Sequence, residues 1–185
     1  MTRIIAGKYR GRKLKVAEGR DIRPTTDRMR ERVFSMLGHH RYPDMHDARV
    51  ADLFAGTGAL GLEALSRGAR HITFVEKSQS SLDNLDHNIS SLDVRDHVTV
   101  LKVSARALPP ISDPYDFIFM DPPYRMGLLE PTLERITSSK WLSNDGVIIA
   151  ELASDDDIDF TDSLELVDER IQGQQRVVFL KQKPI

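Results

Sequence analysis

The sequence predicts an α/β fold in which a seven-stranded, mostly parallel sheet is covered by helices and ends in an antiparallel hairpin. From residue 49 onward, short apolar runs alternate with stretches of helical periodicity, which is typical of parallel strands joined by helices. The last two apolar runs are separated only by Gln172, Gly173 and Gln174, too few residues for a parallel crossover. The 185 residues can bury one sizeable core but are too few for two ordinary domains.

Local sequence patterns predict the individual helices and strands, which follow in chain order. Residues 3–16 have β-forming residues at both ends and glycines between them, which predicts a short hairpin. In residues 23–38, Thr or Asp can cap a helix whose apolar positions share one face, and Gly38 would end it. The later strands are expected near residues 49–54, 71–76, 97–103, 115–120, 146–151, 164–170 and 175–182, and the later helices near residues 59–68, 78–90 and 127–139.

The two parts of the chain carry opposite net charges. Residues 1–41 contain 12 Lys and Arg against 4 Asp and Glu, whereas residues 42–185 contain 14 against 24. We therefore expect residues 1–41 to form a basic extension, a hairpin plus a helix, that binds a phosphate backbone, and residues 42–185 to form the main domain. A merely solvated surface is the alternative interpretation. The candidate phosphate contacts are Arg10, Arg12, Lys13 and Lys15, and the candidates for the approach to the base are Arg28, Arg30 and Arg32.

Composition disfavours several classes of protein. The chain has no cysteine, which excludes disulfides, thiolate metal sites and mechanisms that need a cysteine nucleophile. Its six histidines lack the spacing of metal ligands, so we expect no metal. No apolar run approaches the roughly 18 residues of a membrane span, and the first residues lack a signal-peptide apolar run. We therefore expect a cytoplasmic protein without membrane association.

A glycine-rich turn follows the first strand of the alternating region. Gly56, Gly58 and Gly61 match the G-x-G-x-x-G pattern in its strand-turn-helix context, which lets the backbone approach a nucleotide closely. Asp52 stands at the end of the preceding strand, where its negative charge would oppose the pyrophosphate of a nicotinamide cofactor. This acid favours a cationic ligand.

S-adenosylmethionine is a nucleoside that carries such cationic groups. Asp52 can receive its ammonium directly or through water, and Glu76, at the end of the next strand, can accept hydrogen bonds from both ribose hydroxyls. Ser104, after the third strand, falls where methyltransferases often carry an acid near the adenine. The alternative is that Asp52 and Glu76 are solvated charges at strand ends.

A rigid tetrapeptide, Asp121-Pro122-Pro123-Tyr124, follows the fourth strand. Its two prolines fix two φ angles and hold the neighbouring carbonyl groups in set directions. The Asp121 carboxylate and the Pro122 carbonyl can then accept both hydrogens of an exocyclic amine, while the ring of Tyr124 stacks on a flipped base. We therefore expect Asp121, Pro122 and Tyr124 to be the catalytic residues, although a surface β-turn would explain the tetrapeptide alone.

Together these motifs resemble the class I amino-methyltransferases with an Asn/Asp-Pro-Pro-aromatic motif. Residues 3–14 and 23–31, combined with the motifs at 52–58 and 121–124, are similar to the bacterial RsmD family over nearly the whole chain. The resemblance implies a Rossmann-like fold that uses S-adenosylmethionine, releases S-adenosylhomocysteine and methylates guanine N2 in 16S rRNA of the small ribosomal subunit. It also implies that Thr25 and Thr26 lie near the cofactor. The expected cofactor-binding residues are Thr25, Thr26, Asp52, Phe54, Gly56, Gly58, Glu76, Ser104 and Asp121.

Three other functions remain open from the residues alone. An adenine-N6 methyltransferase acting on DNA or RNA would keep the same chemistry. A nicotinamide-dependent oxidoreductase would use the same glycines, but it leaves Asp121-Pro122-Pro123-Tyr124 and the N-terminal charge unexplained. A nucleic-acid-binding protein without catalysis would keep only the fold. For the RsmD-like interpretation we expect a monomer without a further protein partner.

Overall fold

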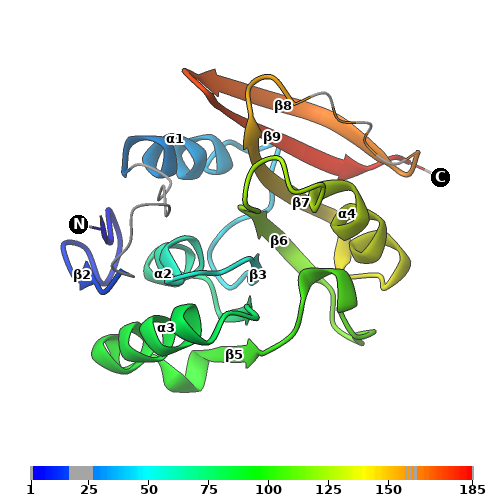
Figure 1. Ribbon diagram of the computed structural model, residues 1–185. Coiled ribbons are helices and arrows are strands. Elements are labelled where there is room, and N and C mark those ends of the chain that lie inside the picture. Colours follow the sequence, from blue (N-terminus) through cyan, green and yellow to red (C-terminus); the bar gives the residue numbers. More distant parts are fainter. Residues whose placement is uncertain (1, 17–26, 157, 159, 161, 185) are drawn as a thin grey trace.

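A seven-stranded sheet in the order β5-β4-β3-β6-β7-β9-β8 forms the centre of the computed structural model (Figure 1). The structure describes residues 2–16, 27–156, 158, 160 and 162–184. Strands β3 to β7 pair in parallel with one another, while β9 is antiparallel to both β7 and β8. The strands are β3 (Arg49–Leu53), β4 (His71–Val75), β5 (Val98–Leu101), β6 (Tyr115–Met120), β7 (Leu142–Ala153), β8 (Leu164–Gln172) and β9 (Gln175–Gln182).

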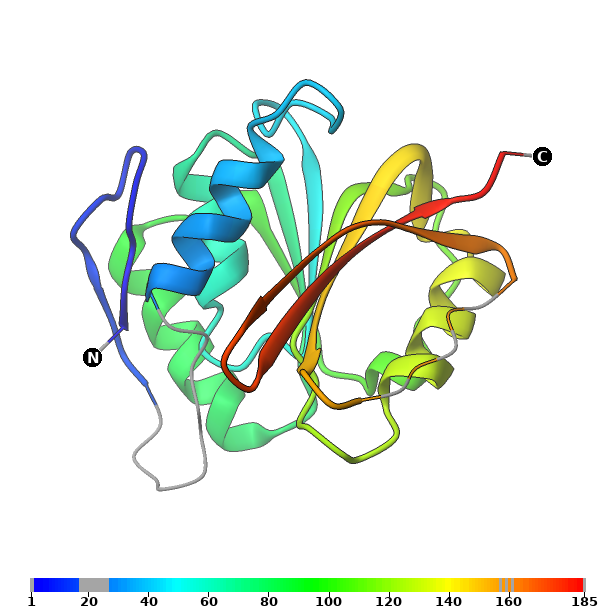
Figure 2. The same cartoon turned by 90° about the horizontal axis from the view of Figure 1, so that it is seen from above.

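Helices cover both faces of this sheet (Figures 1 and 2). Because successive side chains of a strand point to opposite faces, Val50 joins the core beneath α1 to α3, and Ala51 joins the core beneath α4. Among the helices of the described residues, none has both the length and the apolar character needed to cross a membrane. The helices are α1 (Asp27–Leu37), α2 (Ala59–Ser66), α3 (Gln79–Leu92) and α4 (Leu129–Ser138), with short 3-10 helices at Arg95–His97 and Ala105–Ala107.

This architecture confirms the predicted α/β fold, including the antiparallel hairpin of β8 and β9. The largest boundary difference is in β7, which has 12 residues instead of the expected strand over 146–151. Asn144 and Asp145 are exposed and interrupt the apolar pattern on which the prediction rested. The pairing of β6 with β7 also shifts register between Tyr115 and Phe117, so the early part of β7 is irregular.

The predicted N-terminal hairpin is present and lies against α2. Its strands β1 (Thr2–Arg3) and β2 (Lys13–Leu14) pair antiparallel. The buried carboxylate of Glu63 accepts the N–H groups of Ile5, at 2.7 Å, and Ala6, at 3.0 Å. Gly7 has a φ of +81°, and a Cβ there would lie 1.8 Å from the carbonyl oxygen of Ser66, so only glycine permits this close approach.

Helix α1 packs into the main core, on the same side as α2 and α3. Its buried residues Met29, Val33, Phe34 and Leu37 belong to the cluster that also contains Leu62 of α2. The packing therefore does not separate residues 2–16 and 27–41 from the rest of the described chain. The division into a basic extension and a methyltransferase domain stays a prediction about charge and RNA binding.

Candidate active site

Two loops leave the carboxyl edge of the sheet side by side. Leu53, the last residue of β3, pairs with Met120, the last residue of β6. Phe54 and Asp121 therefore begin their loops on adjacent strands, which lie about 4.8 Å apart in a sheet. The strand order reverses at this point, because the chain runs from β3 outward to β5 and then returns to β6. Ligands of open α/β sheets bind in the crevice at such a switch point.

The glycine loop, residues 54–58, combines tight packing with an open cradle. Phe54, Gly56 and Gly58 all have left-handed backbones, with φ angles of +61°, +54° and +80°. A Cβ at Gly58 would lie 2.5 Å from Cδ1 of Leu85, so this glycine lets the loop approach α3. A Cβ at Gly56 would meet nothing closer than the carbonyl oxygen of Phe54, at 3.9 Å. Gly56 therefore borders free space that a ligand can fill.

Asp52 lies beneath the glycine loop and is only 2% exposed. One of its carboxylate oxygens accepts the N–H of Gly61 in the first turn of α2, at 2.9 Å. Burial raises the pKa of Asp52 well above its ordinary value, and the charges of Asp121 and Glu76 raise it further, against the opposing effect of the Gly61 bond. Besides its predicted role toward a cationic ligand, Asp52 thus serves as a cap for α2.

Glu76 follows β4 and is fixed against the glycine loop. Its Oε2 accepts the N–H of Gly56 at 2.9 Å, and its Oε1 accepts the N–H groups of Lys77 and Ser78 at 2.8 and 2.7 Å. A carboxylate has about four lone-pair positions and three of them are used, so the half-buried Glu76 retains capacity for one ribose hydroxyl donor. The glycine loop and the predicted ribose acceptor thus form one hydrogen-bonded unit.

Of the other predicted cofactor contacts, the structure describes Ser104 but not Thr25 and Thr26. Ser104 stands at the start of the 3-10 helix Ala105–Ala107, where its Oγ accepts the N–H of Arg106 at 3.3 Å. Thr25 and Thr26 lie outside the described residues. Within the part of the chain that the structure describes, no group of three or more His, Asp or Glu side chains could hold a metal ion.

Hydrogen bonds to two strands position the ring of Tyr124. Its hydroxyl donates to Oε1 of Glu151 in β7 at 2.5 Å, and Gln175 in β9 donates to the same oxygen at 2.9 Å. Burial raises the pKa of Tyr124, and the hydrogen bond to Glu151 raises it further, so the hydroxyl stays protonated. Pro122 is buried, whereas Asp121 and Tyr124 are half-buried. The loop at residues 121–124, the Asp121 loop, therefore offers a carboxylate and an aromatic ring on a fixed backbone.

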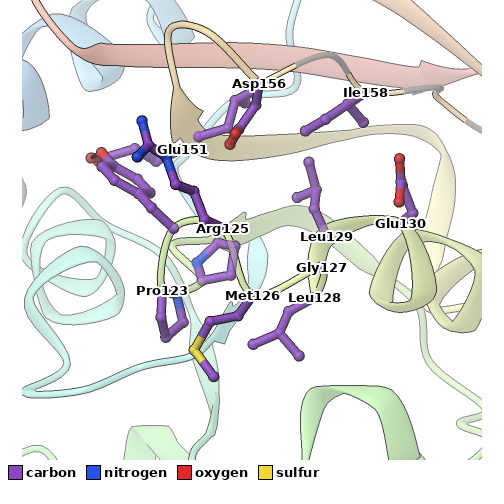
Figure 3. A pocket seen from close by; sticks show the side chains of 13 residues that line it. Pro123, Arg125, Met126, Gly127, Leu128, Leu129, Glu130, Glu151, Asp156 and Ile158 are labelled. Atoms are coloured by element: carbon purple, nitrogen blue, oxygen red, sulfur yellow. Dashed lines mark hydrogen bonds between the residues drawn. The ribbon is translucent and has the colours of Figure 1, made fainter.

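A cavity of about 160 Å³ adjoins this loop, between the loop, the start of α4 and the end of β7 (Figure 3). The loop contributes both prolines and the tyrosine of the predicted motif. The cavity is lined by Pro122, Pro123, Tyr124, Arg125, Met126, Gly127, Leu128, Leu129, Glu130, Glu151, Leu152, Asp156 and Ile158.

Most of the predicted RNA contacts are exposed. Two of these side chains already have partners within the protein: Arg12 donates to the carbonyl of Ser91, and Arg32 donates to Oε1 of Gln172 at 2.8 Å. The exposed residues are Arg10, Arg12, Lys13, Lys15, Arg28 and Arg32.

Arg30 is different, because it is only 1% exposed. Its guanidinium donates to the carbonyl of Arg3, at 2.5 Å, and to the carboxylate of Asp27, at 3.0 Å. Burial lowers its pKa. The prediction that Arg30 contacts RNA therefore does not agree with the structure, in which this side chain joins α1 to the hairpin. Residue spacing alone placed it beside Arg28 and Arg32 without showing which face of α1 is covered.

Asn88 links the hairpin to the glycine loop, a role that none of the sequence motifs indicated. Its fully buried side chain accepts the N–H of Lys15, at 2.7 Å, and donates to the carbonyls of Lys15, at 3.0 Å, and Thr57, at 2.9 Å. Asn88 lies between Leu85 and Ile89 on the apolar face of α3. A polar residue on an apolar face was the available signal, because buried amides need hydrogen-bond partners.

Comparisons with known proteins identify the family of this chain. The family model described as "Conserved hypothetical protein 95" matches residues 2–181. The chain is 40% identical over 149 residues to Ribosomal RNA small subunit methyltransferase D of Escherichia coli (strain K12), covering 80% of this chain and 73% of the relative. It is 34% identical over 175 residues to the protein of the same name from Haemophilus influenzae, covering 92% of this chain and 89% of that relative.

A solved structure supports the same relationship. The protein described as "Putative methyltransferase yhhF from Escherichia coli" is 36% identical to this chain and superposes with a TM-score of 0.85. The match covers 98% of this chain and 97% of that protein. Family model, relatives and structure thus agree over at least 80% of this chain, and the chain belongs to the Conserved hypothetical protein 95 family, that of the RsmD methyltransferases.

Proposed function

We propose that this methyltransferase transfers the methyl group of S-adenosylmethionine to the N2 amine of a guanine in 16S rRNA of the small ribosomal subunit. The pairing of Leu53 with Met120 carries the proposal, because it brings the glycine loop beside Asp121-Pro122-Pro123-Tyr124. The glycine loop is suited to a nucleoside, and the Asp121 loop is suited to a planar amine. Relatives named small subunit rRNA methyltransferase D support the choice of RNA.

The residues around the glycine loop fit a cationic nucleoside. Asp52, Glu76 and Asp121 are close enough for the two other charges to raise the pKa of Asp52. A ligand with an ammonium and a sulfonium offsets this repulsion. Gly56 leaves open space at the loop, and Glu76 is held where it can accept a hydrogen bond from a ribose hydroxyl. When bound, S-adenosylmethionine supplies an electrophilic methyl group.

The Asp121 loop performs the complementary task of orienting the amine. The carboxylate of Asp121 and the carbonyl of Pro122 accept the two N–H groups, which directs the nitrogen lone pair toward the methyl carbon. Such orientation contributes about 7–11 kcal/mol toward a barrier. The N–C bond forms as the C–S bond breaks, and Asp121 or water takes the proton that the nitrogen loses. Tyr124 stacks on the base from a position that Glu151 holds.

The exposed basic side chains of the hairpin and α1 are the proposed contacts to the rRNA backbone. Arg30 is left out of this set because it is buried. A monomer in the cytoplasm, acting on the small subunit or its RNA, is the form in which we expect the enzyme to work.

The test is methylation by the purified protein of 16S rRNA, assembled small subunits and DNA, followed by nucleoside analysis. We expect N2-methylguanosine in the ribosomal substrates and none in DNA. Asp121→Ala should abolish turnover, whereas calorimetry should still detect binding of S-adenosylmethionine, weakened because one of the three acids near the cation is lost. N6-methyladenosine as the product, or full activity of Asp121→Ala, would overturn the proposal.

A further inference from the structure

The cavity beside the Asp121 loop has the size of a ring system. An engineered protein cavity of about 150 Å³ holds benzene, and this open cavity measures about 160 Å³. Pro122, the proposed acceptor for the amine, is among its lining residues, as is Tyr124. A base whose amine lies at Pro122 can therefore extend its adjoining ring atoms into this cavity.

Three carboxylates line the cavity, and the structure distinguishes them. Glu151 is buried and already accepts hydrogen bonds from Tyr124 and Gln175. Glu130 is exposed in the first turn of α4. Asp156 is half-buried and faces Pro123 and Met126 across the cavity (Figure 3).

The position of Asp156 is fixed by the backbone of the preceding turn. Its Oδ2 accepts the N–H of Ala153 at 3.1 Å, and its own N–H donates to the carbonyl of Ala153 at 3.1 Å. The first bond fixes the carboxylate at the cavity wall, and the second fixes the turn that carries it. Arg125, the basic residue of the lining, has its guanidinium 3.1 Å from the carboxylate of Asp155, which is outside the lining. A fixed carboxylate thus faces the space proposed for the base.

A carboxylate in this position distinguishes guanine from other purines. Guanine carries an N1–H next to its N2 amine, so its Watson–Crick edge presents adjacent donors. Adenine and 2-aminopurine carry an unprotonated N1 that repels a carboxylate. Enzymes that act on flipped bases read this edge by hydrogen bonds, and a site built to bond a donor strongly rejects an analogue that lacks it.

We propose that Asp156 accepts the N1–H of the target guanine and thereby selects guanine over purines that lack this proton. The inference rests on the proposed N2 methylation and adds a specificity-determining residue to it. Asp121 and Pro122 bind the amine that reacts, whereas Asp156 recognises the neighbouring ring nitrogen, which does not react.

The experiment compares two RNA substrates, one with the target guanosine and one with 2-aminopurine at that position. Both offer a C2 amine, but 2-aminopurine has no N1–H. The wild-type enzyme should prefer guanine in kcat/KM by roughly 10- to 100-fold, the discrimination of one good base contact. Asp156→Asn should bring the two substrates to within about threefold, because its oxygen keeps the Ala153 bond while its NH₂ donates to an unprotonated N1.

Asp155→Asn is the matched control, one position earlier and outside the cavity lining. It should keep the wild-type preference. A second variant, Asp156→Ala, should lose activity mainly toward guanine, and thermal unfolding of both Asp156 variants reports whether they fold.

The outcomes separate the two proposals. An enzyme that methylates guanine N2, but whose preference is unchanged in Asp156→Asn and Asp156→Ala, would overturn the role of Asp156 and leave the proposed function standing. A wild-type enzyme that methylates neither guanine nor 2-aminopurine would overturn both. A shift in preference confined to the Asp156 variants is the expected result.

Discussion

Asp52 is a carboxylate that the fold buries almost completely and places near two other acids. Its raised pKa means that the folded protein binds the proton more strongly than the unfolded chain does. Stability therefore falls as the pH rises from the ordinary value of 3.8 through the pKa of the folded state, since the ionised form carries the cost of burial. Asp52→Asn removes that cost and keeps an oxygen for the N–H of Gly61.

We expect Asp52→Asn to raise the melting temperature at pH 7. The rise should be about 2–4 °C for each kcal/mol by which the free energy of unfolding increases. The gain should shrink as the pH falls toward 4. Thermal unfolding followed by circular dichroism between pH 4 and pH 8 measures this difference. A gain that is independent of pH would contradict the assigned cause. Binding of S-adenosylmethionine should weaken in the same variant, because the cation loses a charged acceptor.

At the scale of elements, Asn88 ties α3, the end of the hairpin and the glycine loop together through three hydrogen bonds. Asn88→Ala leaves part-buried backbone groups of Lys15 and Thr57 without this partner. A fully buried unsatisfied group costs about 1–3 kcal/mol, and part-buried groups that water can reach cost less. We expect a lower melting temperature and faster amide hydrogen exchange in residues 2–16 and in the glycine loop.

The matched control is Asn84→Ala, on the same helix. The side chain of Asn84 donates to the carbonyl of Ser80 in the first turn of α3, so its removal should not loosen the hairpin. Equal exchange in the hairpin of the two variants would show that Asn88 does not link it to the loop.

At the scale of the whole molecule, the basic hairpin lies on one side of an otherwise acidic chain. Replacing Arg10, Lys13 and Lys15 by Gln should weaken RNA binding without unfolding the protein, because all three side chains are exposed. A plot of the logarithm of the association constant against the logarithm of the salt concentration should become less steep, by about 0.7–0.9 in slope for each phosphate that these side chains no longer neutralise. Lys183→Gln, in an exposed residue near the other end of the chain, is the control. An unchanged slope in the triple variant would contradict the proposed RNA-binding surface.

The sequence alone was sufficient to predict the strands and helices of the main sheet and to identify the residues at the ends of β3, β4 and β6. Each of these depends on a local pattern: apolar periodicity, glycines at a turn, and prolines that fix the backbone. The exposed Asn144 and Asp145 obscured the beginning of β7 because periodicity reports burial rather than hydrogen bonding.

The sequence by itself thus determined the sheet, the glycine loop and the motif at 121–124, together with the resemblance that the comparisons confirmed. Tertiary structure alone decided that Arg30 is buried, that Asn88 joins two distant segments, and that Asp156 borders the cavity beside Pro122. The physical reason is that these properties arise from contacts between residues far apart in the chain. Such contacts depend on which faces the packed elements cover, and local spacing does not encode this.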